Sequence, residues 1–437
     1  MRILLALLLA GALAAAEDSE LFKSARVAME AKIKAGDALL QKGDVDGAVA
    51  SFNDAAQIFR EALTARRGKD GNRAGIIDLG AELAEEIIES EEIEEVAIPV
   101  AKGTSREAVQ RALAWLTNCQ AKDNGAWNAA GFARRAGPGK SAHSVGVTGL
   151  ALMALQRAGA PEGEHAKSVR AGLRYLLAVQ NDKGYFEGMN GSSPHSIYSH
   201  LVASLAMIDA YKRTGKDRYH ASAEKAVDYI VRARNPYMGW RYGFRSGEND
   251  TSVTSLAVFV LDAARKAELK VDAGAFDGAR VWIDKMTDPE SGQVGYIQPG
   301  GMSARTEQGI DKFPPERVQA MTAAGILTRM IAGQDPRRSE LIQKGARLCL
   351  QTVPRADARS MDMYYWYMGT KAMARIGGPS WTQWRSALEP VLRNGQQGDG
   401  TWPAAGAWGS EGGVVYSTAI GALSLHDLIT NGGKTGG

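Results

Sequence analysis

The chain has 437 residues, 45% of them hydrophobic, and its 52 basic and 49 acidic residues give a formal net charge of +3. This length suits one large domain with a smaller one. So small a net charge gives no electrostatic case for a nucleic-acid partner. No segment has the roughly 20 consecutive apolar residues of a membrane-spanning helix, so we expect a protein that is not an integral membrane protein.

The first sixteen residues have the pattern of a signal peptide. Arg2 supplies the positive end, residues 3–13 supply the apolar stretch, and three alanines before Glu17 form a small-residue cleavage site. The sequence therefore predicts an exported protein, periplasmic or extracellular. Export would permit a disulfide, but Cys119 and Cys349 lie in helical patterns and in no metal-binding spacing, so we expect two free thiols.

Residues 17–80 carry the pattern of a helical hairpin. With Gly36 set at position 8 of a tetratricopeptide repeat, the residues at positions 11, 20, 24 and 27 are of the expected types, namely Leu39, Ala48, Phe52 and Ala55. The segment resembles one tetratricopeptide-like hairpin, which implies a contact surface for a partner. A plain amphipathic hairpin without a binding role fits the same pattern.

Residues 81–103 form an acidic segment. Ala81 to Val96 contains eight glutamates and no lysine or arginine, and its isoleucines are spaced for one apolar helical face. Such a charge run is typical of a solvated helix, so we predict a helical linker rather than an acidic partner site. Pro99 and Gly103 then mark a domain boundary.

From residue 104 to residue 430 the chain repeats one unit. The unit is an amphipathic helix, a turn with a glycine before an aromatic residue, and a second, more apolar helix. The turn glycines are Gly125, Gly184, Gly239, Gly295 and Gly400, separated by 59, 55, 56 and 105 residues, the last interval being about two periods. This periodicity is typical of helical repeats. We therefore predict an all-α fold of about six helix pairs, with residues 431–437 as a disordered tail.

Two of these turns have a specific form. Gln180-Gly184-Phe186 and Gln396-Gly400-Trp402 share the order glutamine, three residues, glycine, one residue, aromatic. This order resembles the repeat turn of squalene cyclases and protein prenyltransferases, and the whole region resembles exported bacterial members of that superfamily without an assigned activity. The resemblance implies an α/α toroid, in which outer and inner rings of helices surround a central cavity.

The chemistry of that superfamily is only partly present. The cyclase motif Asp-x-Asp-Asp-Thr, laid on residues 247–251, puts Asn249 where the protonating aspartate belongs and keeps only Asp250 and Thr251. Asparagine cannot act as a general acid. The prenyltransferase zinc pattern needs Asp-x-Cys, which the chain lacks, and its six histidines form no zinc motif, so we expect no metal and no cofactor.

The toroid also predicts which side chains line its centre. When the apolar helices are aligned on one another, several tyrosines and an aspartate fall at one level near the helix starts. The predicted cavity residues, which include one histidine, are Tyr198, His200, Asp250, Thr251, Tyr365, Trp366 and Tyr416. Aromatic walls with few polar groups are typical of a pocket for an apolar or flat ligand.

Asp250 has two interpretations. An aspartate before Thr-Ser-Val at a helix start is a good N-cap, worth about 1 kcal/mol. Paired carboxyls in one cavity would instead serve glycan cleavage, and the candidates are Asp250, Glu248 and Asp362. Two functions therefore remain. One is a non-catalytic toroid that binds an apolar, glycan or protein ligand, and the other is an enzyme, either a divergent terpenoid cyclase or a carbohydrate-active enzyme.

Overall fold

The structure is a computed structural model that describes residues 103–131, 139–158, 163, 165–187, 195–304, 318–357 and 360–431, with isolated positions between 24 and 58. The chain divides into two compact units, Met1–Ala97 and Ile98–Gly437. The predicted signal peptide, the acidic linker up to residue 102 and the tail from residue 432 lie outside the described residues. In the first unit the described positions are helical, and Lys32 Nζ lies 2.7 Å from Asp54 Oδ2. The tetratricopeptide-like hairpin stays a prediction.

The described part of the second unit contains twelve α-helices and no named strand, which confirms the predicted all-α fold of six pairs. The outer helices are α5 (Ser105–Asn118), α7 (Ala166–Val179), α9 (Asp217–Ala233), α11 (Gly274–Met286), α13 (Glu340–Gln351) and α15 (Gly378–Gly395). The inner helices are α6 (Ser144–Ala158), α8 (Ser196–Thr214), α10 (Thr251–Lys266), α12 (Ala320–Ile331), α14 (Met363–Ile376) and α16 (Gly409–Thr430). A short 3-10 helix, η1 (Ser141–His143), precedes α6.

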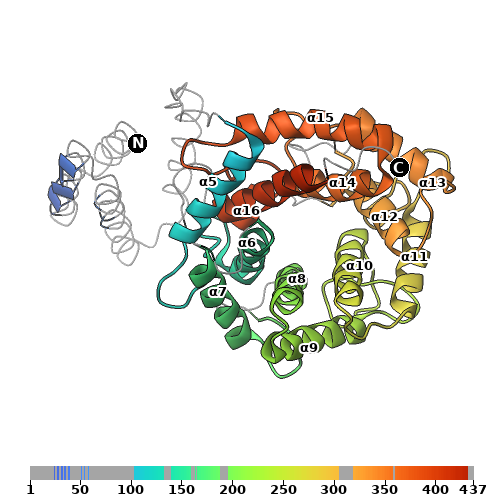
Figure 1. Cartoon of the computed structure of the whole chain (residues 1–437), viewed down its shortest axis with the longest axis horizontal. Helices are drawn as coiled ribbons and strands as arrows, with labels where there is room; N and C mark the ends of the chain where they lie inside the picture. Colours follow the sequence, from blue (N-terminus) through green and yellow to red (C-terminus); the bar gives the residue numbers. More distant parts are fainter. Residues whose placement is uncertain are drawn as a thin grey trace, which may run out of the picture. The chain divides into compact units, whose positions relative to one another are not determined.

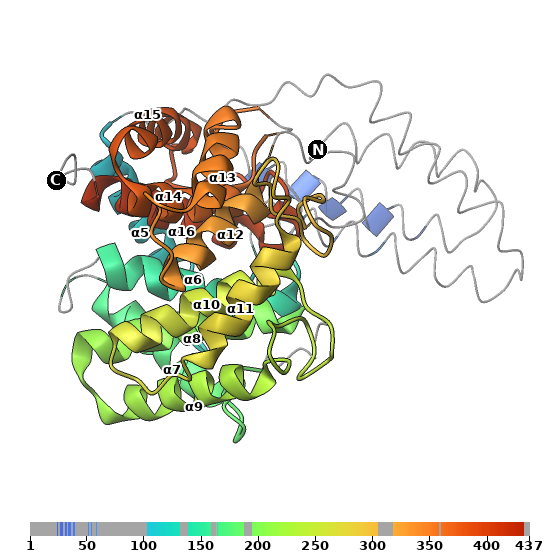
Figure 2. The ribbon, with the colours of Figure 1, turned by 90° about the vertical axis from the view of Figure 1, so that its right-hand side faces the viewer.

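The helices form two concentric rings (Figure 1). Each inner helix packs against the inner helix of the next pair, and α16 packs against α6, so the inner ring is closed. Each outer helix packs against inner helices; for example, α11 runs along α10 and α12 (Figure 2). Outer helix α5 contacts both α6 and α16, and so spans the junction between the first and last pairs.

The sequence explains which helices lie inside. Along α9 the buried residues recur every three or four positions, as in Tyr219, Ala223, Ala226 and Ile230, so this outer helix has one apolar face. Every residue of inner helix α12 is buried, from Ala320 to Ile331. A helix that is apolar on all sides belongs between two layers, and an amphipathic helix belongs outside.

The predicted turns hold neighbouring pairs together. Gln180 Nε2 donates both to the Gly184 carbonyl in its own turn, at 3.1 Å, and to the Ser222 carbonyl of α9, at 3.0 Å. Gln396 does the same in the last turn, donating to Gly400 at 2.9 Å and to Ala108 of α5 at 2.7 Å. One glutamine side chain therefore fixes each such turn to the next outer helix, and in the last turn it closes the ring.

A second repeated hydrogen bond sets the register of the inner helices. In each case the backbone N–H of a turn residue donates to one side chain on the following inner helix. The acceptors, at 2.9 to 3.3 Å, are Thr148, His200, Thr254, Thr322 and Thr418. These five positions are structurally equivalent, and they give a better alignment of the pairs than the apolar runs do.

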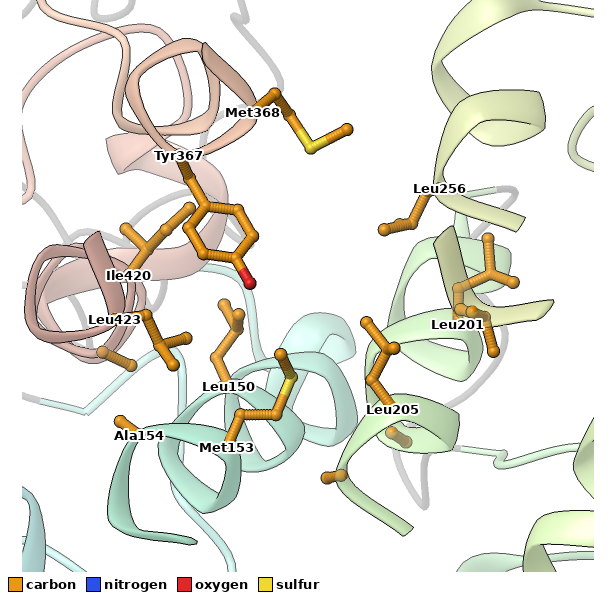
Figure 3. Packing of buried hydrophobic residues seen from close by; sticks show 14 of the residues in the cluster. Leu150, Met153, Ala154, Leu201, Leu205, Leu256, Tyr367, Met368, Ile420 and Leu423 are labelled. Carbon is orange, nitrogen blue, oxygen red and sulfur yellow. The ribbon is translucent and has the colours of Figure 1, made fainter. Parts of the chain in front are cut away.

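The centre of the inner ring is layered. Apolar side chains from five inner helices point into a common central space (Figure 3), among them Leu150, Met153, Leu205, Leu256, Met368 and Ile420. Towards the C-terminal ends of the same helices lie ion pairs, Arg157 with Asp209 at 2.8 Å and Lys371 with Asp427 at 2.7 Å. The central space is therefore apolar at mid-height and charged at that end. Among the described residues, no helix is long and apolar enough to cross a membrane.

Candidate functional site

Two aspartates cap inner helices at the opposite end of the ring. Asp250 precedes α10, and its Oδ1 accepts a hydrogen bond from the Val253 N–H at 2.7 Å. Asp362 precedes α14 and accepts from the Tyr365 N–H at 3.0 Å. Both side chains are fully buried. The predicted cap at Asp250 is confirmed, and Asp362 is its counterpart two pairs further on.

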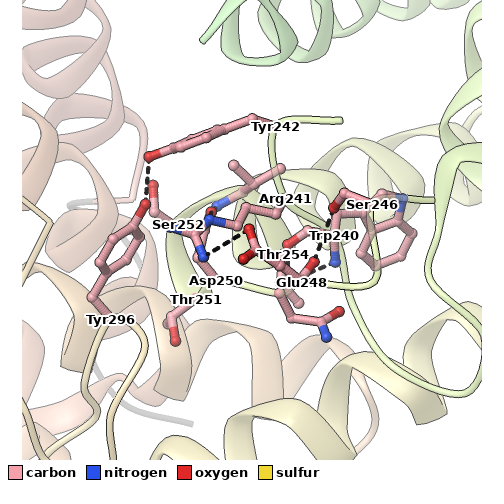
Figure 4. Close-up of polar contacts among 12 residues, drawn as sticks. Trp240, Arg241, Tyr242, Ser246, Glu248, Asp250, Thr251, Ser252, Thr254 and Tyr296 are labelled. Atoms are coloured by element: carbon pink, nitrogen blue, oxygen red, sulfur yellow. Dashed lines mark hydrogen bonds and ion pairs between the residues drawn. The ribbon is translucent and has the colours of Figure 1, made fainter. Parts of the chain in front are cut away.

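Asp250 lies among aromatic hydroxyls and one cation (Figure 4). Its Oδ2 is 3.9 Å from Arg241 Nε, and the Tyr296 hydroxyl is near enough to favour the ionised carboxylate. Tyr296 in turn shares a very short hydrogen bond with the Tyr242 hydroxyl. On the neighbouring inner helix α8, the Tyr198 hydroxyl lies 2.7 Å from Ser252 Oγ of α10. The loops before α10 and α12 and the starts of α8 and α10 thus converge.

Burial controls the charge of Asp250. Desolvation raises its pKa to about 7, against the lowering effects of the Val253 N–H, Arg241 and Tyr296. The carboxyl therefore changes its protonation state near neutral pH. Burial also raises the pKa of Tyr198 well above its usual value, with the charge of Asp250 adding to the effect, so this hydroxyl stays protonated.

Tyr364 connects the two aspartates. Burial raises the pKa of Tyr364, and the nearby charges of Asp362 and Asp250 raise it further. The pKa of Tyr416 is raised by burial, then by Asp362 and Tyr364. Both carboxyls therefore belong to one polar cluster. We call it the polar cup and define it as Tyr198, Arg241, Tyr242, Asp250, Ser252, Tyr296, Asp362, Tyr364 and Tyr416.

The polar cup contains buried polar atoms without a hydrogen-bond partner. They are Asp250 Oδ2, Arg241 Nε and the hydroxyl oxygens of Tyr364 and Tyr416. The five tyrosine side chains of the cup are only partly buried, although they sit at the centre of a closed ring. An arrangement with free donors, a free carboxylate oxygen and accessible aromatic rings can bind a polar ligand.

Some residues predicted to line the cavity lie elsewhere. The ring of His200 packs against Tyr185, Phe186 and Tyr229, on the side of the outer helices. Its Nδ1 accepts from the Phe186 N–H, and desolvation lowers its pKa to about 3. His200 is thus the turn acceptor of its pair, a position that a threonine holds in four others.

Thr251 and Tyr365 also face outwards. Thr251 donates to the Gly295 carbonyl at 2.7 Å and accepts from the indole N–H of Trp282 on α11. The Tyr365 hydroxyl donates to the carbonyls of Thr352 and Cys349 at the end of α13. Their hydrogen bonds direct both side chains to outer helices.

The remaining predicted residues fall into three groups. Tyr198, Asp250, Asp362 and Tyr416 belong to the polar cup. Glu248 lies at its edge, 70% exposed, with its Oε2 at 3.3 Å from Arg241 Nη1. Trp366 is buried, and its indole nitrogen has no hydrogen-bond partner.

Sequence reasoning missed Tyr364, Tyr242, Tyr296 and Arg241. Tyr198, Ser252 and Tyr416 each stand two residues before the turn acceptor of their pair, and Tyr364 of α14 joins them in the cup. Alignment on these turn acceptors would have placed the first three residues in one column. Arg241, Tyr242 and Tyr296 lie in connecting loops, where no repeat pattern points to them.

The described residues contain no group of three or more histidine, cysteine or acidic side chains that could hold a metal ion. Cys119 and Cys349 are free thiols, and burial raises the pKa of each to about 12. Thiolate chemistry at neutral pH is therefore disfavoured at both positions.

The architecture matches known proteins. The family model of the squalene-hopene cyclase C-terminal domain matches residues 93–194. A family 76 glycoside hydrolase from a bovine Bacteroides thetaiotaomicron strain is similar with a TM-score of 0.54 at 10% identity, over 75% of this chain and 78% of that one. The chain has an α/α toroid fold.

Another structure similar to the toroid is the GH76A α-1,6-mannanase from Salegentibacter sp. HEL1_6, with a TM-score of 0.53 at 12% identity. That match covers 75% of this chain and 99% of the mannanase. No curated protein sequence matches the chain. Similarity at such low identity shows the toroid fold alone, so the chemistry has to be argued from the polar cup.

Proposed function

We propose that the toroid is an exported, non-catalytic protein that binds a hydroxyl-rich ligand of the carbohydrate class in the polar cup. The observation that carries this proposal is the set of buried atoms without partners on Asp250, Arg241, Tyr364 and Tyr416. Buried polar groups in proteins are nearly always hydrogen-bonded. Hydroxyl groups both donate and accept, so a polyhydroxylated ligand would satisfy the carboxylate, the guanidinium and the phenols together.

The same atoms argue against a purely apolar ligand. A hydrocarbon in the cup would leave each of them unpaired, at about 1–3 kcal/mol apiece. The partly exposed tyrosine rings suit sugar faces, which are apolar between their hydroxyls. The α-1,6-mannanase of similar fold, named above, supports α-1,6-linked mannose oligomers as the first probes.

Two adjacent tyrosines of α14 provide a matched test. Tyr364→Phe removes a hydroxyl from the cup, whereas Tyr365→Phe removes one that is bonded to α13. We expect Tyr364→Phe to weaken binding of α-1,6-mannotriose by about 5- to 15-fold, the value of one hydrogen bond of 1–1.5 kcal/mol. Tyr365→Phe should leave binding unchanged and lower the free energy of unfolding by about 1 kcal/mol.

Titration calorimetry with a panel of oligosaccharides measures the first effect, and urea unfolding measures the second. Organic extraction of the detergent-free protein followed by mass spectrometry is the control for ligand class. Absence of binding to every glycan, together with a stoichiometric lipid in the extract, would replace the carbohydrate proposal with an apolar ligand.

A second candidate function is hydrolysis of a glycosidic bond. It is favoured by the two buried carboxyls that both act on Tyr364, one of them with a pKa of about 7. A glycosidase needs one carboxylic acid and one carboxylate near the bond to be cleaved. Asp250 would donate the proton to the leaving oxygen, and Asp362 would be the carboxylate.

Incubation of the wild-type protein with α-1,6-mannotriose tests the second candidate. If the protein is a hydrolase, the wild type should release mannose, and neither Asp250→Asn nor Asp362→Asn should do so. If the wild type binds mannotriose without releasing mannose, and Asp362→Asn binds it with a similar affinity, the cup has the non-catalytic function. Chromatography of the products distinguishes the two outcomes.

A further inference from the structure

Arg241 and Asp250 face each other across a gap at the base of the loop before α10. Arg241 Nε and Asp250 Oδ2 are 3.9 Å apart, which is too far for a direct hydrogen bond. Both atoms are buried and neither has a hydrogen-bond partner. Two such atoms can share one oxygen atom that lies beside them, within hydrogen-bond distance of both.

Other contacts keep the gap open. Asp250 is held through Oδ1, which caps α10 by accepting from the Val253 N–H at 2.7 Å. The far side of the Arg241 guanidinium pairs with Glu248 Oε2 at 3.3 Å, and the guanidinium lies 5.4 Å from the centre of the Tyr242 ring. Closing the gap would weaken the cap or the ion pair, so the separation is built into the loop (Figure 4).

We propose that this gap is a recognition subsite for one hydroxyl group of the ligand. Arg241 Nε–H can only donate, and ionised Asp250 Oδ2 can only accept. The group between them therefore has to accept from the arginine and donate to the carboxylate. A hydroxyl does both, an ether oxygen only accepts, and an ammonium only donates.

The subsite belongs to the polar cup and rests on the proposed function, because it names the ligand group that one part of the cup takes. It has its own test, since water fills the same role when no ligand is bound. The proposal for the subsite can be wrong even if the rest of the cup binds a glycan through Tyr364 and Tyr416.

The test uses high-resolution crystal structures of the full chain at pH 8.5, where Asp250 is mostly ionised, soaked with glycerol or with the diether 1,2-dimethoxyethane. In the unsoaked crystal we expect an oxygen atom within about 3.2 Å of both Arg241 Nε and Asp250 Oδ2. Glycerol should replace it with a hydroxyl oxygen, and the diether should leave it in place. Direct contact of the two side chains would overturn the proposal, and so would an oxygen that neither molecule displaces or that both displace.

Asp250→Asn is the matched control, because it should change which oxygen-containing group the gap accepts. With the amide oxygen kept as the cap, the amide NH2 faces Arg241, and the gap is lined by two donors. The variant should then admit the ether oxygen of 1,2-dimethoxyethane, which the wild type excludes. An Asp250→Asn crystal that still excludes the diether while admitting glycerol would show that shape rather than hydrogen bonding selects the occupant.

Discussion

Asp250→Asn is expected to make the protein more stable than the wild type at pH 8, by about 4 kcal/mol. The reason is that burial raises the pKa of this carboxyl from 3.8 to about 7 in the folded state. Each unit of difference between the folded and unfolded pKa corresponds to about 1.4 kcal/mol. The variant loses the penalty for burying a charge, and its amide oxygen still caps α10.

The pH dependence of this effect has a definite sign. Between pH 3.8 and 7 the folded wild type binds a proton at Asp250 that the unfolded chain releases, so this group makes the wild type less stable as the pH rises. The stability gain in Asp250→Asn should therefore be near zero below pH 4, grow between pH 4 and 7, and level off above. Urea unfolding of both proteins at several pH values in this range measures it.

Asp250→Leu is the control, because it removes the charge and the cap together. Its stability relative to Asp250→Asn should be about 1 kcal/mol lower at every pH. If Asp250→Asn were instead less stable than the wild type at pH 8, the carboxylate would be a favourable partner of Arg241. A buried carboxyl that lowers the stability of the protein is typical of a functional site. If Asp250 stabilised the protein instead, the interpretation of the polar cup as a functional site would lose this support.

Gly184→Ala is expected to lower the free energy of unfolding by about 3 kcal/mol or more. Gly184 has φ of 90°, a conformation that L side chains rarely adopt. A Cβ there would also lie 2.2 Å from the Lys225 carbonyl oxygen of α9. Strain and overlap add, and the overlap is with the backbone of α9, which cannot give way as the end of a flexible side chain can.

Gly333→Ala separates the two contributions. Gly333 has nearly the same φ, 93°, but a Cβ there would meet nothing within 4 Å. Its substitution should lower the free energy of unfolding by only about 1 kcal/mol, the value of the conformational strain alone. Urea unfolding of both variants is the measurement. Equal losses would mean that the turn moves away from α9 easily, and that its close approach does not fix the pairs together.

The repeat made the fold predictable from the sequence. The spacing of the five turns with a glycine before an aromatic residue predicted the number of helix pairs, and the apolar and amphipathic periods assigned the helices to inner and outer rings. The cap at Asp250 was also predictable, since Asp-Thr-Ser-Val is a local signal that depends on no other part of the chain.

The candidate site was only partly predictable, for two physical reasons. An inner helix buried on all sides has no polar face to fix its rotation, so alignment on apolar residues selected Tyr365 instead of Tyr364. In five pairs a hydrogen bond from the turn to a threonine or to His200 fixes that rotation. Arg241, Tyr242 and Tyr296 reach the cup from loops, whose paths depend on tertiary contacts.

The contact of α5 with α16 and the hydrogen bond from Gln396 to Ala108 join segments 288 residues apart. The first outer helix therefore has no partner on one side until the last pair has been synthesised. Because the chain is synthesised from its N-terminus, the surfaces of α5 and α6 that contact α16 stay uncovered until α16 has been made. Closure of the ring therefore has to follow synthesis of the last pair, and the cup is complete only when Tyr416 on α16 is in place.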